Sequence, residues 1–252
     1  MTSASPPAGS APSEPAGSRA LQRDVARSSA RLGHVLRSVA THPARGFRSA
    51  QALAGRRERS GRRPAEGLAP YLLAVAGGAA AALLWLKGAA VAGWRNVPQQ
   101  DFHWGYLGGA LLLGAVVALA AQIVWGVVGG RLLRALGGRA STRDLRMVWG
   151  MSAGPQVLAV LLLFPCDALL GGAALFTNGR FADPVAAGWG AVSAALAVLF
   201  QGWSLGLFVR GVEVVSGADL MKTAVAVAGA GACMAVIVAG VSAAVLWAGG
   251  AA

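Results

Sequence analysis

The chain has 252 residues, of which 56% are hydrophobic and 13% are charged, about half the charged share of an ordinary soluble domain. With a positive mean hydropathy, this composition places the chain among membrane proteins and argues against a soluble globular domain. The formal net charge of +12 suits a partner that carries phosphates, either anionic lipid or nucleic acid. The long apolar stretches favour lipid over nucleic acid as this partner.

The N-terminal part is basic, because 12 of the 20 arginines precede Leu68. Residues 1–18 are mostly Ser, Ala, Pro and Gly, which predicts a disordered tail. Residues 19–67 form a basic segment that we expect in the cytoplasm. Between Arg19 and Ala40 the apolar residues fall on one side of a helix. The basic residues on the opposite side include Arg19, Arg23, Arg27, Arg31 and Arg37.

A helix of this kind typically lies in the headgroup layer of an anionic leaflet. Two alternatives remain open: the helix packs on the protein's own cytoplasmic loops, or it folds only when bound. After His42 and Pro43 the pattern stops, and residues 44–66 carry arginines among small residues, which indicates a solvated linker.

Residues 68–248 are expected to form an all-α, polytopic transmembrane helix bundle of about five spans, because a span needs about 20 apolar residues. The third span is expected to end between Phe164 and Leu175. Lys87 extends the first span if its side chain snorkels to the headgroups. The five predicted spans are Leu68–Leu86, Trp104–Gly130, Val148 to about Leu175, Val185–Phe208 and Thr223–Trp247.

Orientation follows from the positive charges of the connections, since basic loops stay in the cytoplasm. The connection after the second span holds five arginines, and the one after the fourth holds Arg210 and Lys222. The opposite side has only Arg95 and Arg180, with Lys87 nearby. We therefore expect a cytoplasmic N-terminus and a C-terminus outside. The abundance of Ala, Gly and Arg is typical of a GC-rich genome and suggests the plasma (inner) membrane of a bacterium.

Two stretches resemble the Yip1-domain family of membrane proteins. The connection into the third span begins with Gly137 and Gly138 and leads to a Gly-x-Ser-x-x-Pro motif, Gly150 to Pro155. A second short connection runs from Gly211 to Ala224 and includes a Lys-Thr-Ala opening of the last helix. The resemblance covers about residues 68–248 and implies a five-span fold with a cytoplasmic N-terminus. The acidic and aromatic segment that eukaryotic members place before their first span has no counterpart, so their vesicle-trafficking role and prenylated GTPase partners are not carried over.

Polar residues within the spans are the remaining candidates. Asp167 is the only carboxylate placed in a span. One interpretation is that it belongs to an ion path or to a polar lock between helices. The sequence favours the other, in which the span ends at Pro165 and Asp167 caps the following turn at the outer surface. Pro155 is expected to bend the third span. Gln156 and Gln201 are expected to hydrogen-bond between helices.

No enzyme site is predicted. Gly202 to Gly206 match the Gly-x-Ser-x-Gly motif of a nucleophile elbow, but Ser204 lies within a predicted helix and has no histidine on a neighbouring span. No His or Cys cluster predicts a metal site, no glycine pattern predicts a cofactor, and Cys166 and Cys233 are expected to be packed thiols.

The sequence thus predicts a non-enzymatic scaffold or membrane-organising protein that contacts anionic headgroups. Pairs of glycines four residues apart, such as Gly202 and Gly206, suggest a homo-oligomer or contacts with other membrane proteins. The alternative is a small-solute or ion transporter, or a transporter subunit, whose path Asp167 and the glutamines line. A nucleic-acid or envelope tether that uses the arginines is a third, weaker hypothesis.

Overall fold

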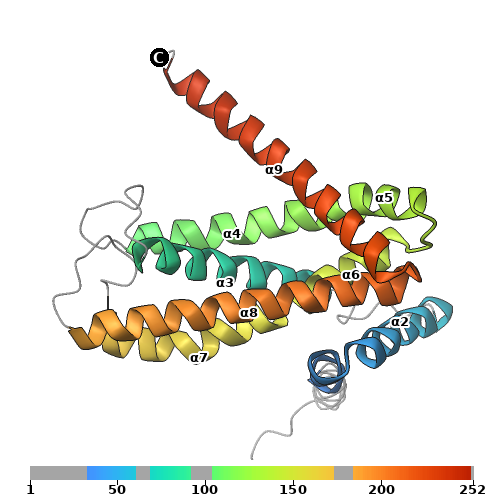
Figure 1. Ribbon diagram of the computed structural model, residues 1–252, viewed down its shortest axis with the longest axis horizontal. Coiled ribbons are helices and arrows are strands. Elements are labelled where there is room, and N and C mark those ends of the chain that lie inside the picture. The colour runs from blue at the N-terminus through green and yellow to red at the C-terminus, as the bar shows by residue number, and fades with distance from the viewer. Residues whose placement is uncertain (1–32, 61–68, 92–103, 173–183, 251–252) are drawn as a thin grey trace, which may run out of the picture. The chain divides into compact units, whose positions relative to one another are not determined.

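The computed structural model describes residues 33–60, 69–91, 104–172 and 184–250, and within these ranges every regular element is a helix (Figure 1). The chain divides into two units, residues 1–34 and 35–252, and the labelled helices all belong to the second. These helices are α2 (Pro43–Ser60), α3 (Ala69–Val91), α4 (Trp104–Val124), the π-helical turn η2 (Trp125–Gly129), α5 (Gly130–Ala135), α6 (Thr142–Ser152), α7 (Gly154–Leu170), α8 (Pro184–Ser216) and α9 (Leu220–Gly250).

The helices form a polytopic membrane bundle. Among the described residues, four helical stretches are long and apolar enough to cross a membrane: Ala69–Gly88, Leu107–Ala135, Thr142–Leu170 and Pro184–Ser216. The fifth predicted span falls on α9, whose apolar portion within the described residues, Leu220–Val236, is shorter. The prediction of an all-α, polytopic bundle of about five spans is therefore confirmed as an all-helical membrane bundle with four to five long apolar helices.

Large apolar side chains lie on the outside of this bundle. Leu112, Leu161 and Leu199 are exposed, Leu199 to 68%, whereas small side chains such as those of Ala159 and Ser193 are buried. Helices that are apolar on all sides are typical of a bilayer environment, where association depends on close packing rather than on escape from water. The exposed leucines consequently face lipid.

The most extensive helix contact joins α3 and α4, which run side by side (Figure 1). A Cβ atom added at Gly114 would lie 2.5 Å from the carbonyl oxygen of Gly78 and 2.6 Å from the Cβ of Ala82. Only glycine permits this approach, because any side chain would overlap the neighbouring backbone.

The third predicted span is divided into two helices. Ser141 caps α6 by accepting a hydrogen bond from the Asp144 amide at 3.1 Å, so the helix starts before the expected Val148. The helix is interrupted at Ala153, and Pro155 stands in the first turn of α7, where its missing N–H costs little. Pro165 lies inside α7, which continues to Leu170. The favoured prediction that the span ends at Pro165 is wrong.

The predicted solvated linker after Pro43 is also wrong over its described part, because α2 occupies Pro43–Ser60 and packs on α8. Phe47 anchors it and is 0% exposed. The Phe47 ring lies where Gly211 leaves room, since a Cβ at Gly211 would come within 2.7 Å of both Phe47 and Val148. The helix is amphipathic, but it has only one large apolar side chain on its buried face among several arginines, which is why the linker prediction missed this helix.

A π-helical turn separates α4 from α5. Such turns widen a helix by one residue and often occur at functional sites. Here the turn carries Trp125, which is 1% exposed and makes an edge-to-face contact with Phe208 of α8 at 4.9 Å between ring centroids. Gly129 makes room for the indole ring, because a Cβ there would lie 2.6 Å from Trp125.

Candidate functional site

Three helices bring ionisable and polar side chains together at one end of the bundle. Lys87 lies about one turn before the end of α3, and Asp167 about one turn before the end of α7. Trp189 and Ser193 lie near the start of α8, and their spacing of four residues places both on the same helix face. The four residues, Lys87, Asp167, Trp189 and Ser193, are called the polar lock below.

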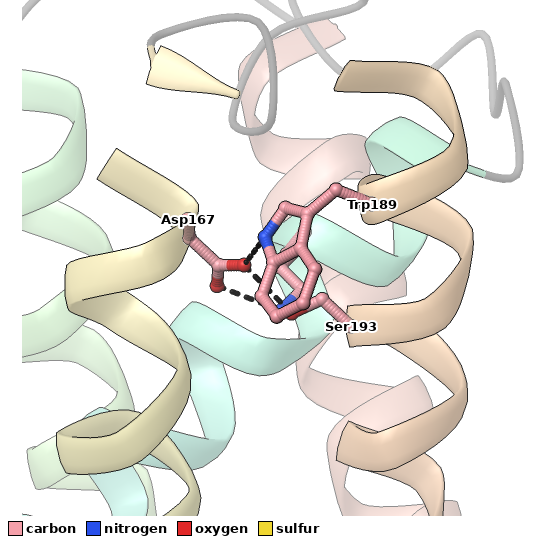
Figure 2. A network of polar contacts seen from close by, with 4 residues as sticks. Asp167, Trp189 and Ser193 are labelled. Carbon is pink, nitrogen blue, oxygen red and sulfur yellow. Dashed lines mark hydrogen bonds and ion pairs between the residues drawn. The ribbon is translucent and has the colours of Figure 1, made fainter. Parts of the chain in front are cut away.

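The Asp167 carboxylate is the centre of the polar lock (Figure 2). Its Oδ2 atom is 2.7 Å from Lys87 Nζ in an ion pair. Its Oδ1 atom accepts hydrogen bonds from Ser193 Oγ at 2.6 Å and from Trp189 Nε1 at 2.9 Å. Lys87 Nζ donates a further hydrogen bond to Ser193 Oγ. The carboxylate therefore has three donors, and the ammonium group has two acceptors.

Burial is nearly complete, with Lys87 1% and Asp167 3% exposed. The structure thus corrects the favoured prediction that Asp167 is a cap at the outer surface. Lys87 does not reach toward the headgroups, because it is buried in the pair with Asp167. A lone charge inside a membrane helix is costly, about 2.5–3.5 kcal/mol at the helix centre on insertion scales, and pairing with an opposite charge reduces this cost at any depth.

The ion pair and its hydrogen bonds can hold α3, α7 and α8 together in one specific arrangement. Breaking a buried ion pair by removing one partner destabilises a protein by about 3–5 kcal/mol, because the other charge is left without compensation. Replacing both partners by apolar residues is often neutral. We therefore expect the polar lock to favour one arrangement of the helices rather than to add much net stability.

The sequence alone pointed to Asp167 but not to its partners. Lys87 and Asp167 each lie near the end of an apolar span, and an alternating topology places both span ends on the same side of the membrane. Two opposite charges at the same depth in the membrane were the signal that could have identified the pair. Trp189 and Ser193 gave no such signal, since both are common in membrane helices.

The two predicted interhelical glutamines are brought together. Gln156 Nε2 of α7 donates to Gln201 Oε1 of α8 at 2.8 Å. Pro155, the preceding residue, is buried at the break between α6 and α7. The break therefore positions Gln156 toward α8.

Ser204 lies inside α8, and its hydroxyl donates to the carbonyl oxygen of Ser152 at 2.6 Å. The acceptor is one of the carbonyl groups at the end of α6, which helix geometry leaves without an intrahelical partner. The Gly-x-Ser-x-Gly motif thus serves here as a link between two helices. In the described part of the chain, no group of three His, Cys, Asp or Glu side chains could hold a metal ion.

Three of the N-terminal arginines, Arg37, Arg45 and Arg48, are exposed on the helix that ends at residue 41 and on α2. The other predicted lipid-contact residues, Arg19, Arg23, Arg27 and Arg31, lie outside the described residues, as does the predicted tail. The two cysteines are free and exposed, contrary to the expected packing.

Apolar helices that expose leucine and enclose a buried ion pair define an integral, polytopic membrane protein. The Yip1-domain family model matches residues 37–243, most of the chain, which therefore belongs to the Yip1-domain family. Members of this family are generally non-enzymatic membrane trafficking proteins.

The match begins at Arg37, well before the expected start near residue 68, so the end of the first described helix and α2 are part of the domain. Comparison with curated proteins and with solved structures finds no match.

Proposed function

We propose that this protein is a non-enzymatic, membrane-organising scaffold in the inner membrane of a bacterium, with its basic N-terminal segment bound to anionic headgroups on the cytoplasmic face. The observation that carries the proposal is the arrangement of α2: Phe47 anchors the helix to the bundle, while Arg45 and Arg48 remain exposed. A helix seated in this way holds its arginines near the headgroups, where each adds about 1 kcal/mol of attraction to an anionic leaflet.

The placement of the basic connections supports the cytoplasmic assignment. The Arg139 amide donates to the carbonyl oxygen of Ser216 at 3.0 Å, so the connection after α5 meets the end of α8. Phe47 of α2 packs beside Gly211 at the same end of α8. One end of the bundle therefore gathers the arginine-rich connections and α2, and the polar lock lies near the start of α8, toward the other end. By the positive-inside rule the arginine-rich end is cytoplasmic.

The proposal is tested with the full-length protein in vesicles. An environment-sensitive fluorophore is attached to Ser49→Cys, an exposed position of α2, after Cys166→Ala and Cys233→Ala remove the native thiols. We expect a blue-shifted emission in vesicles that contain phosphatidylglycerol but not in pure phosphatidylcholine, because charge draws α2 into the headgroup layer.

Two matched triple variants separate the effect of the arginine charges from the effect of changing the side chains. Arg37→Gln/Arg45→Gln/Arg48→Gln should lose the blue shift, whereas the corresponding triple lysine variant should keep it. High salt should also weaken the shift, since surface attraction is screened beyond about 8 Å at physiological ionic strength. Equal emission in both kinds of vesicle would contradict lipid engagement.

The second candidate function is a transporter or transporter subunit, and the buried pair of Lys87 and Asp167 favours it, because ionisable residues inside spans often mark ion paths. If the pair carries protons or ions, Asp167→Asn should abolish a flux into vesicles that Ser204→Ala leaves intact. Equal fluxes in the two variants would count against transport.

We also propose that the bundle associates with a second copy or with other membrane proteins. Gly105 and Gly206 face open space on their helices, which leaves room for a neighbouring helix. Cross-linking of the full-length protein in native membranes tests this proposal.

A further inference from the structure

Buried side-chain atoms without a hydrogen-bond partner gather around the π-helical turn η2. Within the described part of the chain these atoms are Gln122 Oε1, Trp125 Nε1, Arg146 Nε and Thr223 Oγ1. Gln122 lies just before η2, and Trp125 is the first residue of the turn. Arg146 belongs to α6 and Thr223 to α9, and both of these helices pack on η2. The unpaired atoms thus surround one irregular turn of the bundle.

Neither solvent nor lipid relieves the free-energy cost of these atoms. All four are inaccessible in the described conformation, and a buried donor or acceptor without a partner destabilises a protein. Their chemistry is nevertheless complementary. The nitrogen atoms of Trp125 and Arg146 are donors, Gln122 Oε1 is an acceptor, and a hydroxyl group such as that of Thr223 is both. A second conformation in which these atoms pair therefore gains hydrogen bonds that the described conformation lacks.

Gln122 and Arg146 are already neighbours. Gln122 Nε2 donates to the carbonyl oxygen of Arg146 at 2.9 Å. Gly126 follows Gln122 by one helical turn on the same face, and a Cβ atom at Gly126 would lie 3.0 Å from Arg146 Nε. A small displacement of η2 along α6 therefore brings Gln122 Oε1 within reach of Arg146 Nε.

The backbone of η2 permits such a displacement. A π-helical turn forms hydrogen bonds five residues apart instead of four, so exchange between the two patterns moves the extra residue along the helix. Gly126 and Gly129 lie within the turn, and Gly130 follows it. Glycine has no side chain to obstruct the exchange and adopts the widest range of backbone conformations.

We propose that η2 is a conformational switch. Trp125 moves between its described buried position and a second one, in which the unpaired atoms bind one another. In the described position Trp125 contacts Phe208 edge to face at 4.9 Å between ring centroids, and Trp149 contacts the same ring at 5.3 Å. All three rings line a large apolar groove between α3, α4, α8 and α9. Departure of Trp125 therefore widens the groove and loosens α4 from α8, independently of the lipid contacts proposed for α2.

The test is hydrogen exchange of the full-length protein in detergent, followed by mass spectrometry. Exchange of a buried amide reports the population of the conformation in which its hydrogen bond is broken. Thr223→Val keeps the shape of the side chain but removes the unpaired hydroxyl, which favours the described conformation over the second one. Exchange of the η2 amides should therefore slow about tenfold, whereas α7 should exchange as in wild type. Ser204→Ala is the control, because it removes a buried hydroxyl that has a partner, and it should not slow exchange in η2.

A second comparison uses the aromatic residues. Trp125→Phe removes the unpaired donor, and Trp149→Phe is its control for the smaller ring, since both tryptophans contact Phe208. Exchange in η2 should be about fivefold slower in Trp125→Phe than in Trp149→Phe. Unchanged or faster exchange of η2 in Thr223→Val would overturn the proposal. Equal slowing in every helix would show a general gain in stability without a switch, and would overturn it as well.

Discussion

At the residue scale, the charges of Lys87 and Asp167, which lie in distant parts of the sequence, form one ion pair with no net charge. Lys87 and Asp167 are both almost fully buried and 2.7 Å apart. Lys87→Met should therefore reduce the free energy of unfolding by about 3–5 kcal/mol, because Asp167 is left as an uncompensated buried charge. The measurement is thermal unfolding in detergent, followed by circular dichroism.

The double variant is the control for this prediction. Lys87→Met/Asp167→Leu should regain most of the lost stability, since no charge remains to be compensated. A Lys87→Met variant as stable as wild type would show that the ion pair does not fasten α3 to α7.

A second residue-scale prediction concerns Asp219, which precedes α9 and accepts a hydrogen bond from the Lys222 amide at 2.8 Å. That backbone hydrogen bond is the main reason why the pKa of Asp219 is lowered from its ordinary value of 3.8. A lowered pKa stabilises the folded state above pH 3.8, and the contribution is lost as pH falls through the folded value. Acidification should therefore loosen the first turn of α9.

Hydrogen exchange at the Lys222 amide measures this effect. The protection of wild type relative to Asp219→Ala should be largest near neutral pH and should be lost as the pH falls through the lowered pKa of Asp219. The same ratio at every pH would show that the Asp219 carboxylate does not cap the helix.

At the element scale, helix packing depends on a few close approaches. Gly78→Ala should destabilise the bundle by about 1–3 kcal/mol, because the new methyl group would overlap the backbone of α4 at Gly114. Gly108→Ala is the control, since this α4 position has nothing within 4 Å. Thermal unfolding of both variants in detergent tests the prediction, and equal stabilities would contradict the α3–α4 contact.

The seating of α2 is a separate element-scale prediction. Phe47→Ala removes a fully buried ring, a loss of about 3–5 kcal/mol in a protein core, and should release α2 from α8. Limited proteolysis with trypsin should then cleave after Arg45 and Arg48 at least tenfold faster. Ser49→Ala, at an exposed position of the same helix, should leave the rate unchanged. Unchanged cleavage in Phe47→Ala would show that Phe47 does not hold the helix.

At the scale of the whole molecule, the sequence predicted the membrane class and the approximate spans because the bilayer thickness demands long apolar helices. It did not predict the partners of Asp167, because which span ends meet depends on packing between distant segments. The contact between Phe47 and Gly211 was not predicted either, since it depends on packing between α2 and α8, which are far apart in the sequence. Gln156 and Gln201 were predicted to form hydrogen bonds between helices, but the sequence did not predict that they bind each other.

We propose that the bundle has five spans, with the arginine-rich end in the cytoplasm and the C-terminus outside. Thiol labelling with a membrane-impermeant maleimide tests it most directly, with Ser49→Cys or Ala252→Cys introduced after Cys166→Ala and Cys233→Ala. The account predicts that Ser49→Cys reacts only in inverted vesicles and Ala252→Cys only in intact spheroplasts. Reaction of both positions from the same side would contradict it.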